Sequence, residues 1–154
     1  MAVVSRQADR ETRPRVDLRR LGPPTLVLLL IAAGCNGGTV TSYRFGKDAE
    51  SLSSTAADGA LLAAGTAKGE TTAPYTRVHA SELGKDAGKL ADVLRSAHPK
   101  PELAAKTAKL TQLADRASSE LERLEDSPAD HEVARQVRSS LSDISDQATK
   151  LGGG

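Results

Sequence analysis

Residues 101–125 read PELAAKTAKLTQLADRASSELERLE, and this stretch decides the fold. Apolar side chains recur there at alternating steps of three and four residues, which is the spacing of one face of an α-helix. Charged side chains fall between them and suit the solvent-facing side. Such a helix must bury its apolar face against another element. The inward positions that we expect are Leu103, Thr107, Leu110, Ala114, Ala117, Leu121 and Leu124, with Leu113 broadening the face.

The same spacing occurs in three further segments, which we expect to be helices over about residues 47–67, 74–97 and 128–151. Their expected inward positions are Ala49, Leu52, Ala56, Ala60, Ala63 and Ala67; Ala80, Leu83, Ala87, Leu90, Leu94 and Ala97; and Ala134, Val137, Leu141, Ile144, Ala148 and Leu151. The first segment is the weakest helix, because Gly59 and Gly65 each cost about 1 kcal/mol relative to alanine. Gly84 and Gly88 lie beside the second stripe, where they either permit close helix approach or weaken the helix.

Short turns separate the four segments. Gly69 suits a helix C-terminal cap, and Ser127 is expected to cap the last helix with Pro128 at its first position. Turns of only about 3–6 residues make neighbouring helices antiparallel. We therefore expect an all-α domain, an up-down-up-down four-helix bundle over residues 47–151, with residues 152–154 as a glycine tail. A three-helix bundle with a loose first helix and a dimerising helical hairpin are the alternatives.

An apolar run, Leu26 to Ala33, precedes the chain's only cysteine, Cys35. Its eight residues are far fewer than the roughly 20 that a helix needs to cross a bilayer. The run fits the centre of a secretory signal peptide instead. A basic region precedes it, with Arg19 and Arg20 closest to the run. This arrangement predicts an exported protein, through the general secretory or the twin-arginine route.

Small residues lie between the apolar run and Cys35. The tetrapeptide Ala32-Ala33-Gly34-Cys35 resembles the lipobox of bacterial lipoproteins, which reads Leu-Ala-Gly-Cys or a near variant. This resemblance covers about the first 36 residues of the chain and implies cleavage after Gly34 and lipidation of the Cys35 thiol. Residues 1–34 would then be a cleaved signal peptide, and residues 35–46 the lipidated cysteine and a flexible tether. The resemblance also implies a location at the cell membrane or the outer membrane, facing the extracytoplasmic side.

Composition limits the classes of partner. Removal of the leader's six arginines and three acids leaves 15 basic and 17 acidic residues in the mature chain. This near-neutral balance does not suit a nucleic-acid-binding protein. Two tyrosines, one phenylalanine and no tryptophan offer few stacking surfaces for bases or sugars. We expect the chain to be attached to the membrane through a lipid on Cys35. We expect its protein partner to be another envelope protein or a second copy of the chain.

Few residues suggest chemistry beyond Cys35. The histidines are His79, His98 and His131, and a di-metal bundle would need Glu-x-x-His pairs. The nearest match is the reversed motif His79-Ala80-Ser81-Glu82, and the expected inward positions carry no carboxylate. We therefore expect no metal, cofactor or catalytic residue, and a protein that is not an enzyme.

Tyr75, Arg77 and His79 form the most distinctive local cluster, since an aromatic ring, a cation and an imidazole lie within two turns of the second helix. This cluster is a candidate contact surface. The sequence thus predicts a lipid-anchored helical interaction or scaffold module of the cell envelope. A helical bundle that binds a small ligand or a metal is the alternative.

Overall fold

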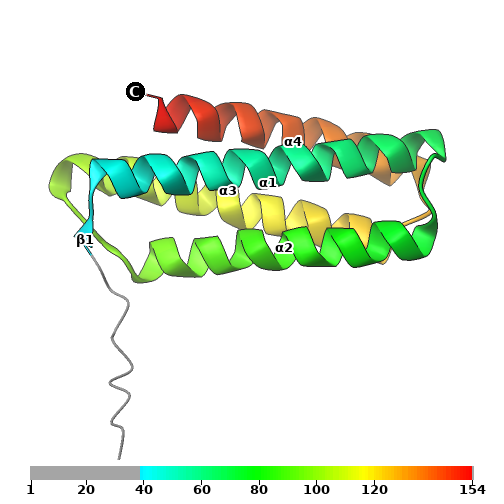
Figure 1. The fold of residues 1–154 in the computed structure, drawn as a ribbon, viewed down its shortest axis with the longest axis horizontal. Coiled ribbons are helices and arrows are strands. Elements are labelled where there is room, and N and C mark those ends of the chain that lie inside the picture. The colour runs from blue at the N-terminus through cyan, green and yellow to red at the C-terminus, as the bar shows by residue number, and fades with distance from the viewer. Residues whose placement is uncertain (1–38, 154) are drawn as a thin grey trace, which may run out of the picture. The chain divides into compact units, whose positions relative to one another are not determined.

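The computed structural model describes residues 39–153. Within this range the elements are β1 (Thr39–Val40), α1 (Ser42–Lys68), α2 (Ala73–Ser96), β2 (His98–Pro99), α3 (Pro101–Asp126) and α4 (His131–Gly152). Consecutive helices run in opposite directions along a common axis (Figure 1). The prediction of an all-α, up-down-up-down four-helix bundle is therefore confirmed.

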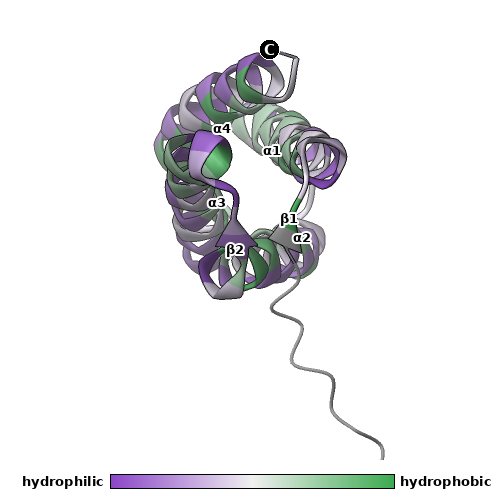
Figure 2. Cartoon of the chain, turned by 90° about the vertical axis from the view of Figure 1, so that its left-hand side faces the viewer, coloured by the Kyte–Doolittle hydropathy of each residue, from purple (hydrophilic) through white to green (hydrophobic). Residues whose placement is uncertain are grey.

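All four helices contribute to one core. The most extensive contacts join α1 to α4 and α2 to α3, and contacts of α1 with α2 and of α3 with α4 close the bundle. The end-on view in Figure 2 shows the helices around a shared interior, with the two short strands at the near end. The three-helix alternative is wrong, because α1 buries Leu52 fully among the other helices.

Most predicted inward positions are buried. The exceptions are half-buried and pack against the edge of the core: Ala67, Leu83, Leu90, Ala97 and Leu151. Thr107, the one polar residue on the predicted stripes, is buried as well. The period of three and four residues thus identified the core-facing side of each helix.

The glycines of α2 serve close packing against α3. The Ser118 hydroxyl donates a hydrogen bond to the Gly84 carbonyl oxygen over 3.0 Å. A Cβ atom added at Gly88 would lie 3.4 Å from the Ser118 Oγ atom, so the two helices are already near contact there. Of the two roles that the sequence left open, the structure supports close helix approach.

The prediction that residues 35–46 form a flexible tether is wrong for residues 39–46, which belong to the folded bundle. β1 pairs in parallel with β2, with Thr39 opposite His98 and Val40 opposite Pro99. α1 begins at Ser42, five residues earlier than expected. The physical reason is burial, because Val40 and Phe45 both belong to the core. The folded bundle therefore begins only four positions after Cys35.

The predicted ends of α4 also need correction. Asp130 caps this helix instead of Ser127, because its carboxylate accepts hydrogen bonds from the amides of Glu132 (2.8 Å) and Val133 (3.1 Å). Gly152, expected in the tail, is the last residue of α4. A Cβ atom there would lie 2.9 Å from the Cβ of Ala49, so α1 and α4 pack closely at this end. Gly69, at φ 72°, caps α1 as predicted.

Candidate functional site

The predicted contact cluster is only partly assembled by α2. The rings of Tyr75 and His79, one turn apart, lie with their centroids 4.2 Å apart and their planes tilted by 56°. The Nδ1 atom of His79 is 3.3 Å from a carboxylate oxygen of Glu82. Arg77 follows Tyr75 by two positions, which on a helix rotates it to another face. The structure thus brings together Tyr75, His79 and Glu82, and separates Arg77 from them.

Tyr75 and His79 line a surface groove between α1 and α2, which we call the α1–α2 groove. Its volume is about 510 Å³. The half-buried Leu62 and Leu83 lie against the core and supply apolar surface to the groove. Leu61 is 71% exposed and Tyr75 is 52% exposed, so both present apolar surface to solvent. The groove therefore combines apolar residues of two antiparallel helices.

Carboxylates give the α1–α2 groove its charge. Asp58 lies on α1, and Glu82 and Asp86 lie on α2. Within residues 39–153, the residues that line the groove include neither lysine nor arginine. Lys89, outside the lining, reaches Asp86 with its ammonium nitrogen 3.1 Å from a carboxylate oxygen. The groove thus carries negative charge on both helices, partly balanced at Asp86.

Hydroxyl groups hold the turn at one end of this groove. The Oγ1 atoms of Thr66, Thr71 and Thr76 lie 3.0 Å from one another in all three pairs. His131 has its Nδ1 atom 2.9 Å from the carbonyl oxygen of Thr66. Since a carbonyl can only accept, the ring N–H donates this bond and joins the start of α4 to the end of α1. These bonds fix how α1 and α2 flank the groove.

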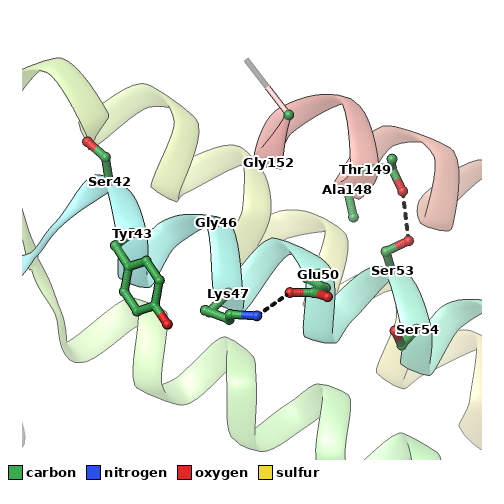
Figure 3. A pocket seen from close by; sticks show the side chains of 11 residues that line it. Ser42, Tyr43, Gly46, Lys47, Glu50, Ser53, Ser54, Ala148, Thr149 and Gly152 are labelled. Carbon is green, nitrogen blue, oxygen red and sulfur yellow. Dashed lines mark hydrogen bonds and ion pairs between the residues drawn. The ribbon is translucent and has the colours of Figure 1, made fainter.

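A second groove lies where the start of α1 meets the end of α4 (Figure 3). Its volume is about 500 Å³. The Ser53 and Thr149 hydroxyl oxygens lie 2.8 Å apart across the two helices. A hydrogen bond from Lys47 to Glu50, 2.8 Å long, lowers the pKa of the Glu50 carboxyl. Tyr43 lines this groove and is 79% exposed.

The two residues of the predicted lipid anchor, Gly34 and Cys35, do not fall within the part of the chain that the structure describes. Over residues 39–153, no group of three or more His, Cys, Asp or Glu side chains is arranged to hold a metal ion. In the same range, no helix is both long enough and apolar enough to cross a membrane.

Sequence reasoning missed the α1 side of the α1–α2 groove. Leu61 follows the buried Ala60 directly and falls outside the inward stripe of its helix. A leucine outside the stripe signals exposed apolar surface. It does not reveal that Tyr75, fourteen residues later, would lie across the same groove, because that requires the path of the intervening turn.

Comparisons of the chain with protein-family models, with curated proteins and with solved structures gave no significant match. The residues of the chain and the geometry of the bundle are therefore what indicate its function.

Proposed function

We propose that this chain is a lipid-anchored protein of the cell envelope that works by contact with other proteins and not as an enzyme. The observation that carries the proposal is the lipobox-like Ala32-Ala33-Gly34-Cys35, placed directly before a folded bundle. Cleavage after Gly34 would make Cys35 the first residue of the mature protein. The anchor would hold the bundle at the cell membrane or the outer membrane, on the extracytoplasmic side.

The short connection to the bundle supports this function. Only four positions separate Cys35 from Thr39, where β1 begins. An extended chain spans at most about 3.5 Å per residue, so the bundle would stay within about 14 Å of the lipidated residue. A lipid at Cys35 would thus keep one end of the bundle close to the bilayer surface.

The lipid itself would supply the binding energy. Each buried methylene contributes about 0.8 kcal/mol, and stable attachment needs two acyl chains because one chain binds reversibly. The diacylglyceryl group implied by the lipobox carries two chains. The nearly balanced charges of the mature chain would add little attraction to anionic lipids.

Metabolic labelling tests the anchor. Cells that express the wild-type chain, Cys35→Ala or the neighbouring control Asn36→Ala are grown with an alkyne fatty acid. Label per molecule of immunoprecipitated protein and the share of protein in washed membranes are then measured. We expect the wild type and Asn36→Ala to carry the label and to remain in the membranes, and Cys35→Ala to lose both. Undiminished label in Cys35→Ala would contradict the proposal.

A further inference from the structure

We propose that the α1–α2 groove binds a helical segment of a partner protein whose apolar face is flanked by lysine or arginine. This inference deepens the proposed contact function, and it does not depend on the lipid anchor. It rests on exposed apolar side chains, on one carboxylate of α1 and two of α2, and on the length of the groove.

Exposed apolar side chains gather at this groove. Over residues 39–153 the large hydrophobic residues that are exposed are Tyr43, Leu61, Tyr75, Val78 and Val93. Leu61 and Tyr75 line the groove. Val78 is 55% exposed and follows Tyr75 by three positions, so the two are neighbours on the surface of α2. Clustered apolar surface of this kind marks contact sites more often than scattered single residues do.

The charges select the partner. Asp58 on α1 faces the same groove as Glu82 and Asp86 on α2. A helix laid between them would have carboxylates on both sides. Lysine or arginine on its flanks would be attracted to both rims, whereas acidic residues there would be repelled. Charge complementarity therefore favours a basic amphipathic segment.

A second copy of this chain is the less favourable occupant. A two-fold symmetric contact would place the same surface patch of each copy against the other. Asp58, Glu82 and Asp86 of one copy would then meet those of its neighbour. Like charges brought together across an interface are unfavourable, so the acidic rims oppose pairing through this groove.

The length of the groove suits a short helix. Tyr75 and Asp86 lie eleven positions apart on α2, which corresponds to about 16 Å along the helix axis. A partner helix of about three turns would match this span, with apolar anchors at positions i, i+3 or i+4, and i+7.

Peptide binding to residues 36–154 tests the inference. This fragment holds the whole core, which extends from Val40 to Ala148. The probe is a fluorescent 14-residue peptide with leucine at the anchor positions and lysine on the flanks, and the control peptide has glutamate in place of every lysine. Fluorescence anisotropy gives both dissociation constants, at about 50 mM and about 300 mM salt. We expect the lysine peptide to bind at least about tenfold more tightly at low salt, with a smaller difference at high salt.

Two matched triple variants locate the binding site. Asp58→Asn/Glu82→Gln/Asp86→Asn removes the carboxylates of the groove. The control, Glu102→Gln/Glu122→Gln/Asp126→Asn, removes three exposed carboxylates that do not line the groove. We expect the first to weaken binding of the lysine peptide about tenfold and the second to leave it nearly unchanged. Leu61→Ser should also weaken binding, because it removes an apolar contact. Circular dichroism verifies that each variant is folded.

Several outcomes would overturn the inference. These are no binding of the lysine peptide, equal binding of both peptides by the wild type, or equal losses in the two triple variants. Sedimentation that shows a dimer, and a monomer for Leu61→Ser, would instead assign the groove to a second copy. None of these results depends on Cys35, so they remain distinct from failure of the lipid anchor.

Discussion

Asp130 fixes the start of α4 through its charge as well as its geometry. Hydrogen bonds from the amides of Val133 and Glu132 lower the pKa of its carboxyl in the folded state. The ionised carboxylate therefore stabilises the fold above its ordinary pKa, and this contribution is lost as the pH falls through the lowered value. We expect Asp130→Ala to be less stable than the wild type at pH 7, with a difference that shrinks below roughly pH 4.

Urea denaturation across this pH range measures the effect of Asp130. Asp130→Asn is the control, because asparagine caps a helix about as well but carries no charge. It should retain most of the stability at neutral pH and lose the pH dependence that comes from this site. A constant difference between Asp130→Ala and the wild type from pH 7 to strongly acid solution would contradict the assigned role.

Two glycines of α1 should respond in opposite ways to alanine. A Cβ atom at Gly59 would lie 2.9 Å from side-chain carbons of both Leu121 and Leu141, which are fully buried. Overpacking costs about 1–3 kcal/mol, which exceeds the gain of about 1 kcal/mol in helix propensity. At Gly46 the nearest atom is 4.0 Å away, so the gain remains. Urea denaturation should show Gly59→Ala destabilised and Gly46→Ala stabilised; a stabilised Gly59→Ala would contradict this packing.

At the level of elements, substitutions at the start of α1 distinguish the observed fold from the flexible tether that the sequence predicted. Phe45 is buried against the core while Tyr43, two residues earlier, is exposed. We expect Phe45→Ala to lower the free energy of unfolding by about 3 kcal/mol or more, and Tyr43→Ala to change it by less than about 0.5 kcal/mol. Chemical denaturation of both variants measures this. Small and equal effects would mean that residues 39–46 behave as a tether.

Helices could be predicted from the sequence where apolar residues keep a regular spacing over many residues. In α3 the stripe from Leu103 to Leu124 keeps the period for more than twenty residues, and its positions are all buried. Residues 39–46 hold only Val40, in β1, and Phe45, in α1, as buried apolar residues, five positions apart. Two residues are too few to show a period. Their burial could therefore not be predicted from spacing, and it depends on the three-dimensional fold, in which β1 pairs with β2.

Turn geometry and grooves lie beyond what spacing can predict. Ser127 and Asp130 are both suitable cap residues, and the path of the chain decides which carboxylate or hydroxyl meets the free amides of α4. The candidate site followed the same pattern. Tyr75 and His79 are neighbours on one helix, as their spacing of four residues indicates, whereas Asp58 and Leu61 join them only through the packing of α1 against α2.

For the whole molecule, the α1–α2 groove lies away from the end of the bundle where α1 begins. Leu61 follows Ser42, the first residue of α1, by nineteen positions, or about 28 Å along the helix axis. A lipid at Cys35 would tether the end of the bundle where α1 begins. The groove would then stand away from the bilayer surface, where a segment of another envelope protein can reach it.

The lipid anchor is tested most directly by mass spectrometry of the mature protein purified from washed membranes. We predict that its N-terminal peptide begins at Cys35 and carries the mass of a diacylglyceryl group on the thiol, with or without an acylated amino group. An N-terminal peptide that retains residues before Cys35, or one that begins at an unmodified Cys35, would contradict the proposal.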